Sequence, residues 1–222
     1  FFTQAIRGQS VETLPQAVSR ICGTCSLAHT MCCIEAIERA LKVPVSEQTK
    51  LLKKLTMYGL MIRDHALHIY LFALPDVFEK DSVLDFQGEE KQYLKDSFDV
   101  KRAGNKLSTA VAGRAVHAPY PVPGGFSAIP NEKELKELIP ELKLAREKVM
   151  KVLGIYAKCN RNYTRETKFV ALKGEEFDFL GDYIETSEGE KILEEKYFEH
   201  LEKVVIPYSQ SVGYEFQNKT YM

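Results

Sequence analysis

The stretch that decides the fold is Arg20-Ile21-Cys22-Gly23-Thr24-Cys25-Ser26-Leu27-Ala28-His29. Two cysteines three positions apart can form a tight turn when a glycine lies between them, because glycine lacks the Cβ atom that would crowd it. Such a turn can direct two sulfurs at one metal ion, join them in a disulfide, or place two reduced cysteines in a core. Arg20 adds a positive charge that favours thiolate over thiol. The segment therefore leaves metal binding, redox exchange and simple packing open.

The composition is that of a soluble globular protein and argues against several classes of function. The chain has 222 residues and a formal net charge of -1, with 45% hydrophobic and 27% charged residues. This length allows one large domain or two small ones. The near-zero charge, without a block of basic residues, argues against nucleic acid as a partner. The longest dense apolar run, Ile69 to Leu74, is too short to span a bilayer.

The cysteines indicate a reducing compartment. There are five, and four of them lie close together: Cys22, Cys25, Cys32, Cys33 and Cys159. An odd and clustered set does not fit the disulfide framework of a secreted protein. We therefore expect a cytoplasmic protein, in which a C-x-x-C pair is a metal or redox site. A thioredoxin-type site is disfavoured because the motif does not follow a strand in a βαβ unit.

Apolar residues recur every three or four positions over most of residues 1–160, which predicts a body of long helices. The predicted helices cover residues 26–41, residues 47–74 with Ser46 as N-cap, residues 87–112 with an interruption near Gly104, and residues 132–159 with Asn131 as N-cap. Pro75 is expected to end the second of these helices, and Pro140 to kink or split the last one. A Pro- and Gly-rich loop over residues 113–130 separates the last two.

Residues 161–222 change character and predict a small α+β segment. Lys168–Leu172 and Phe177–Ile184 look like strands, Glu188-Gly189 like a tight turn, and Glu194–Val205 like a helix. The expected fold class is therefore mainly α: a long-helix body over residues 1–160, which carries the cysteine pair and the histidine motifs, with a small β-containing insert near the C-terminal end.

Both ends of the sequence predict a fragment of a longer polypeptide. The first residue is Phe1 rather than methionine. Residues 214–222 read as a strand, a polar turn and the start of another strand that has no partner to pair with. We therefore expect the second segment to be incomplete at its C-terminal end.

Histidines and one arginine mark further candidate site residues. His29 lies four residues after the second cysteine, on the same helix face, where it can donate a hydrogen bond to the thiolate. His65 and His68 are three apart and could chelate a metal, although buried, hydrogen-bonded histidines are the expectation from spacing alone. Arg114 and His117 open the Pro- and Gly-rich loop, and such a loop can line a site.

Taken together, these motifs resemble the large (catalytic) subunit of nickel–iron hydrogenases. Three signatures of that family occur in order: R-x-C-G-x-C-x-x-x-H at Arg20–His29, then His65-Ala66-Leu67-His68 followed by Leu74-Pro75-Asp76, then Gly113-Arg114-Ala115-Val116-His117 followed by Pro123-Gly124-Gly125. Residues 180–189 are similar to the β insert of the cytoplasmic sulfhydrogenase-type members. The three ordered signatures make the resemblance specific.

The resemblance implies a fold, a metal centre and a reaction. It implies the long-helix body of that family and a nickel–iron centre that activates H2 heterolytically. Cys22 would be a terminal ligand to nickel, and Cys25 would bridge nickel to an iron that carries CO and CN ligands. His29 would support the bridging thiolate. The other residues that would surround the metal ligands are Arg20, His65, His68, Arg114 and His117.

The resemblance also implies partners, and the sequence departs from the family's pattern at two points. Electrons would pass to an iron–sulfur small subunit and to further flavin or NAD(P) subunits, and a magnesium or second iron ion could accompany the centre. The family's second cysteine pair, in a D-P-C-x-x-C motif, is absent from this sequence. The family usually has a glutamate where this chain has Thr3. As given, the chain therefore supplies half of the expected thiolates.

Two other functions remain open on the sequence. One is a metal-free electron-transfer subunit related to the quinone-binding subunit of respiratory complex I, against which the retained cysteine pair speaks. The other is a non-catalytic metal or interaction module, such as a zinc protein, for which a C-x-x-C pair lacks the second pair of ligands.

Overall fold

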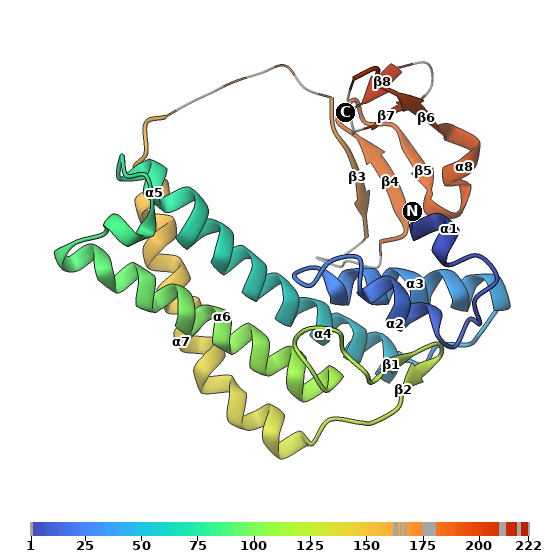
Figure 1. Ribbon diagram of the computed structural model, residues 1–222, viewed down its shortest axis with the longest axis horizontal. Helices are drawn as coiled ribbons and strands as arrows, with labels where there is room; N and C mark the ends of the chain where they lie inside the picture. Colours follow the sequence, from blue (N-terminus) through green and yellow to red (C-terminus); the bar gives the residue numbers. More distant parts are fainter. Residues whose placement is uncertain are drawn as a thin grey trace. The chain divides into compact units, whose positions relative to one another are not determined.

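The computed structural model describes residues 2–161, 164, 166, 168–174, 181–208, 212–216 and 219–221. The chain divides into two compact units, Phe1–Asn160 and Arg161–Met222. The first is built mainly of helices and the second mainly of short strands (Figure 1). The expected mainly α fold class is therefore confirmed. Within the described part of the chain, none of the helices has both the length and the apolar character that crossing a bilayer requires.

The first unit begins with three helices around the cysteine turn. They are α1 (Phe2–Ala5), α2 (Leu14–Ser19) and α3 (Ser26–Leu41). Of the apolar residues that recur every three or four positions along α3, Leu27, Met31, Ile34 and Ile37 are buried as predicted, whereas Leu41 at the end of the helix is exposed. The helix ends where Lys42 adopts a left-handed conformation. This end agrees with the helix predicted over residues 26–41.

Helix α4 (Glu47–Ala66) begins at its predicted cap, because the Ser46 Oγ accepts a hydrogen bond from the Thr49 N–H at 3.2 Å. The sequence predicted that the helical run would stop before Pro75, but it does not. The chain continues as a π-helix, η1 (Leu67–Ala73), and then as α5 (Leu74–Val77). Pro75 lies in the first turn of α5, where a helix needs no N–H donor, so the proline is accommodated without breaking the run.

Helix α6 (Lys91–Ala112) follows two 3₁₀ turns, η2 (Val83–Asp85) and η3 (Gly88–Glu90). The interruption expected near Gly104 is wrong, since α6 is continuous there. Gly104 instead lies where α6 crosses α4: a Cβ built on it would approach the Gly59 carbonyl oxygen to 2.6 Å. The two glycines therefore allow a close backbone approach between the two helices.

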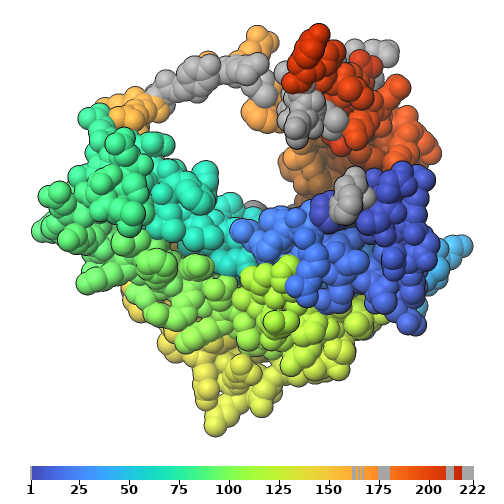
Figure 2. Space-filling view, in the orientation of Figure 1, coloured from blue at the N-terminus to red at the C-terminus, as the bar shows by residue number. Residues whose placement is uncertain are grey.

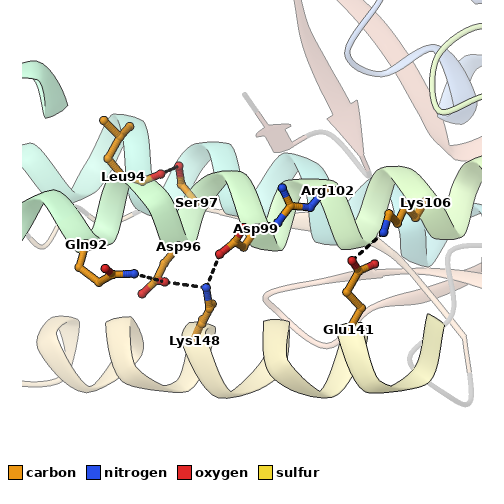
Figure 3. Close-up of polar contacts among 9 residues, drawn as sticks. All are labelled: Gln92, Leu94, Asp96, Ser97, Asp99, Arg102, Lys106, Glu141 and Lys148. Atoms are coloured by element: carbon orange, nitrogen blue, oxygen red, sulfur yellow. Dashed lines mark hydrogen bonds and ion pairs between the residues drawn. The ribbon is translucent and has the colours of Figure 1, made fainter. Parts of the chain in front are cut away.

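Helix α7 (Glu132–Tyr156) starts at its predicted cap, where the Asn131 Oδ1 accepts from the Lys133 N–H at 2.8 Å. It contains Pro140 and still runs as a single helix, so the expected split is wrong. Figure 3 shows the polar bridges that join it to α6. The Lys106 Nζ lies 2.7 Å from a Glu141 carboxylate oxygen, and Lys148 pairs with two aspartates of α6.

The main core of this unit lies between α4, η1, α6 and α7. Its buried members are Ala66, Tyr70, Leu74, Phe86, Val100, Ala103, Ala145 and Val152. The loop after α6 carries a short hairpin of β1 (Pro121–Val122) and β2 (Gly125–Phe126). The N–H of Gly124, at the hairpin turn, donates to the Glu38 Oε1 at 2.8 Å, and Glu38 forms a buried ion pair with Lys53 of α4.

The second unit holds two antiparallel sheets of three strands among its described residues. One has the order β3 (Val170–Lys173), β4 (Tyr183–Thr186) and β5 (Lys191–Leu193); the other has β6 (Leu201–Val205), β7 (Val212–Phe216) and β8 (Lys219–Tyr221). Between β5 and β6 lie η4 (Glu194–Lys196) and α8 (Tyr197–His200). Ile184, Ile192 and Phe216 form a buried core of this unit.

Several expectations for this unit need correction. The helix predicted over Glu194–Val205 ends at His200, after which the chain pairs with β7 as a strand that ends in two valines. The last strand is not unpaired, because Lys219 of β8 pairs with Phe216 of β7. The turn at Glu188-Gly189 is confirmed, with Gly189 at a φ of 87°. Of the strand predicted over 177–184, residues 177–180 lie outside the described residues, and Tyr183 and Ile184 belong to β4.

Candidate metal centre

The two cysteines occupy a tight turn between α2 and α3. Cys25 is the N-cap of α3, and its N–H donates to the Cys22 Sγ at 3.4 Å. The Sγ of Cys25 lies 3.3 Å from the Nε2 of His29, one helical turn further along α3. Both thiols are partly exposed and neither forms a disulfide. The geometry therefore gives two adjacent thiols on one turn, with an imidazole nitrogen against the second.

The two thiols are inequivalent. Hydrogen bonds from the side chain and the N–H of Cys25 hold the pKa of the Cys22 thiol below its usual value. The pKa of Cys25 is raised, because its proton is retained in the bond to Cys22 and because the group is partly buried. Arg20, whose charge was expected to favour the thiolate, is exposed and is not among the groups that lower the Cys22 pKa.

The loop after α6 returns to this turn through His117. The His117 N–H donates to the Ser26 Oγ at 3.1 Å, and its Nδ1 lies 3.3 Å from the Ser19 Oγ. Both serines are fully buried. His117 has a φ of 53°, in the left-handed region where non-glycine residues are uncommon. The first and third sequence motifs are thus in direct contact, and Figure 2 shows the blue N-terminal segment against the yellow-green loop.

Arg63 of α4 joins the same two segments, and the sequence reasoning missed it. Its guanidinium donates to the carbonyl oxygens of Thr24, between the two cysteines, and of Ala115, in the loop; the second distance is 2.7 Å. Its Nε donates to the Asp64 carboxylate at 2.8 Å. The side chain is only 4% exposed. An arginine in a helix rich in core residues was the only signal in the sequence.

The structure does not bring every candidate residue to the thiols. His65, His68 and Arg114 are exposed, and none of their side chains makes a hydrogen bond within the described residues. The expectation that both histidines are buried and hydrogen-bonded is wrong. The buried residues of this segment are Ala66, Tyr70 and Leu74, which are spaced by four, so His65 and His68 fall off that core-facing stripe.

The described residues supply only part of a metal site. Within them, no three or more His, Cys, Asp or Glu side chains are grouped closely enough to hold a metal ion. Two thiols on one turn are a soft but incomplete donor set. Thr3, at the position where a carboxylate was expected, lies in α1 and is exposed.

Comparison with known families decides the relationship. Residues 2–97, which include the cysteine turn, Arg63 and the His65–His68 segment, match the family described as nickel-dependent hydrogenase. The chain is thus similar to nickel-dependent hydrogenases, over less than half of its length by this family model and over most of its length by individual relatives. The recognition made from the three motifs is confirmed.

The proteins that this chain is similar to include subunits of archaeal enzymes. The sulfhydrogenase 2 subunit alpha of Pyrococcus furiosus is 33% identical over 157 residues, which cover 71% of this chain and 38% of the relative. The sulfhydrogenase 1 subunit alpha of the same organism is 29% identical over 226 residues, which cover 100% of this chain and 53% of the relative. The chain thus spans about half or less of the length of these relatives.

Solved hydrogenase structures share the fold. An NAD+-reducing [NiFe]-hydrogenase in the H2-reduced state superposes with a TM-score of 0.81 at 20% identity, covering 97% of this chain and 53% of that one. The Ni-Fe-Se hydrogenase from D. vulgaris Hildenborough gives a TM-score of 0.72 at 20% identity, covering 94% and 48%. The expected long-helix body of the family is therefore confirmed. None of these relatives supports the metal-free, quinone-binding alternative.

Proposed function

We propose that this chain is part of the catalytic subunit of a nickel–iron hydrogenase that cleaves and forms H2 reversibly. The observation that carries the proposal is the turn with two adjacent thiols and His29 3.3 Å from the second sulfur, in a chain that is similar to this family. Thiolate sulfur is a soft ligand that suits nickel and iron in a reduced site. Cys22 and Cys25 are then two of the protein ligands, and the remaining thiolates come from sequence not contained in these residues.

The residues of the chain would prepare this site before a metal arrives. Hydrogen bonds from Cys25 hold the pKa of Cys22 below its usual value and favour the thiolate, and the family resemblance makes Cys22 the terminal ligand in this proposal. His29, through its Nε2, holds the orientation of the Cys25 sulfur, which would be the bridging ligand. The bound nickel–iron group, with CO and CN on iron, would supply the heterolytic cleavage of H2.

The partners follow from the same assignment. A catalytic subunit of this kind passes electrons to an iron–sulfur small subunit, and the relatives named as alpha subunits support the existence of further subunits. The likeness to an NAD+-reducing hydrogenase supports flavin or NAD(P) subunits as the next electron acceptors. We place the complex in the cytoplasm, where thiols such as the five of this chain stay reduced.

The test uses the full-length chain, produced with its hydrogenase maturation machinery and its partner subunits. Cys22→Ser and Cys25→Ser are expected to lower nickel content and H2-dependent dye reduction to background. Cys32→Ser is the matched control: this cysteine is exposed on α3 and outside the turn, so metal content and activity should stay at the wild-type level.

Two results would overturn the proposal. Full nickel occupancy in Cys22→Ser or Cys25→Ser would show that the turn is not the metal site. Zinc without nickel in the native complex, with no hydrogen activity, would support a metal-binding interaction module in place of the enzyme.

A further inference from the structure

Arg63 is the residue through which α4 contacts both halves of the candidate site. One guanidinium nitrogen donates to the Thr24 carbonyl oxygen, and the other terminal nitrogen donates to the Ala115 carbonyl oxygen at 2.7 Å. We infer that Arg63 is a positioning residue that fixes the Cys22–Cys25 turn against the loop that carries His117. This inference rests on the proposed function for its consequence at the metal, and on the contacts alone for its effect on the turn.

The cysteine turn depends on support from outside itself. Its own hydrogen bonds are weak: the Cys25 N–H donates to the Cys22 Sγ, a weak sulfur acceptor, at 3.4 Å, and the Ser26 N–H donates to the Gly23 carbonyl oxygen over a long 3.4 Å. For a bond between an N–H and a carbonyl oxygen, this length is at the weak end of the usual range. A bond from the buried guanidinium to the Thr24 carbonyl is charge-assisted and therefore stronger. It holds the peptide that sets the direction of the Cys25 side chain.

The second contact of Arg63 extends this support to the loop. Ala115 lies two residues before His117, which has the left-handed backbone and binds Ser26 at the start of α3. A residue in that region persists only where its surroundings hold it. Arg63 therefore closes a ring of contacts that runs from the turn to the loop and back to α3.

The backbone of Arg63 is itself held in place. A Cβ built on Gly104 would meet the Arg63 backbone nitrogen at 2.8 Å, so α4 and α6 touch at this residue. The Nε is occupied by Asp64 at 2.8 Å. The planar guanidinium reaches three acceptors in fixed directions, which the single ammonium group of lysine cannot reproduce.

The experiment compares Arg63→Gln and Arg63→Lys with the wild type in the full-length complex. Lys53→Gln is the matched control, because Lys53 is also a buried base on α4, but it pairs with Glu38 beside the hairpin turn. Hydrogen–deuterium exchange is followed by mass spectrometry in peptides that cover residues 20–29 and 113–120. Infrared spectra of the iron-bound CO and CN groups are recorded on the same samples.

We expect both Arg63 variants to exchange about tenfold faster in both peptides, as loss of a charge-assisted bond predicts, and to shift or broaden the CO and CN bands. Lys53→Gln should leave residues 20–29 and the bands unchanged. If Arg63→Gln does not accumulate as a folded protein, Arg63→Lys carries the comparison.

Wild-type exchange in both peptides of the Arg63 variants would overturn the inference, as would equal acceleration in Lys53→Gln. Absence of CO and CN bands from the wild type would overturn the proposed function instead. The exchange comparison would still decide the role of Arg63.

Discussion

At the scale of single residues, the buried charges of the helical unit act as connectors between segments that are distant in sequence. The ion pair of Glu38 and Lys53 joins α3 to α4, and Glu38 also accepts a hydrogen bond from the Gly124 N–H of the hairpin turn. Lys148 joins α7 to α6. Burying a charge is costly unless it is paired, so each of these groups favours the one arrangement that pairs it. These charged groups therefore help to select one packing arrangement of the helices, and they add less to the net stability.

The ion pairs of Lys148 lead to a prediction about how the stability of the protein changes at low pH. The hydrogen bond and charge of Lys148 hold the pKa of the Asp99 carboxyl below its usual value, despite some opposing desolvation. A group with a lowered folded pKa stabilises the protein above its unfolded pKa, about 3.9 for Asp, and loses that stabilisation as pH falls through the folded pKa. The side chain is 34% exposed, so solvent screening limits the effect to less than about 1 kcal/mol.

Asp99→Asn should therefore lower the urea midpoint of the full-length protein at pH 7, with a difference that shrinks below about pH 4. Far-UV circular dichroism at a series of pH values measures it. Glu137→Gln, which removes a charge from the exposed surface of α7, is the control and should show a smaller difference at pH 7. A constant Asp99→Asn difference from pH 7 to pH 3 would contradict the assignment.

At the scale of elements, local signals predicted the helices and distant contacts explain the errors. The caps at Ser46 and Asn131 are confirmed because they depend on neighbours three or fewer residues away. The period of 3.6 residues carries no signal for the π-helix η1, which adds a residue to each turn. Strand β6 looked helical because its pairing with β7 is not visible in its own sequence.

The same difference between local and distant contacts decides which parts of the candidate site could be predicted from the sequence. The contact between Cys25 and His29 could be predicted because a spacing of four places both on one helix face. Arg63 could not, because its partners lie 39 and 52 residues away and are backbone carbonyls, which every residue type possesses. The exposure of His65 and His68 depends on which side of the continuous run of α4 and η1 faces the core.

The close crossing of α4 and α6 leads to a prediction about stability, for which another helical glycine serves as the control. Gly104→Ala places a Cβ 2.6 Å from the Gly59 carbonyl oxygen, so the helices must separate. Overpacking of this kind costs about 1–3 kcal/mol, against a gain in helix propensity of up to about 1 kcal/mol. We expect a net loss of free energy of unfolding in the full-length protein, measured by urea titration.

Gly154→Ala in α7 has nothing within 4 Å of the new Cβ and keeps only the propensity gain. It should leave stability unchanged or raise it by up to about 1 kcal/mol. Stabilisation by both alanines would show that the helices do not approach closely at Gly104.

At the scale of the whole molecule, the proposed metal site and the two three-stranded sheets belong to different units. Cys22, Cys25, Arg63 and His117 all belong to the unit Phe1–Asn160. The unit Arg161–Met222 has its own core at Ile184, Ile192 and Phe216. A ligand that binds only the folded state stabilises the region that must stay folded to hold it. Metal insertion should therefore stabilise the first unit more than the second.

The full-length protein isolated before and after metal insertion tests this difference by hydrogen–deuterium exchange. Metal at about a hundred times its Kd should slow the opening of residues 20–29 by up to about a hundredfold, since a ligand that binds only the folded state stabilises it by RT ln(1 + L/Kd), where L is the free ligand concentration. Residues 113–118 should gain protection through the contacts of Ser26 with His117. Strands β4 and β5 should exchange at the same rate in both forms. Cys22→Ser/Cys25→Ser taken through the same maturation is the control and should show no change in either unit. Equal protection of β4 and β5 in the wild type would mean that the second unit also contributes to holding the metal.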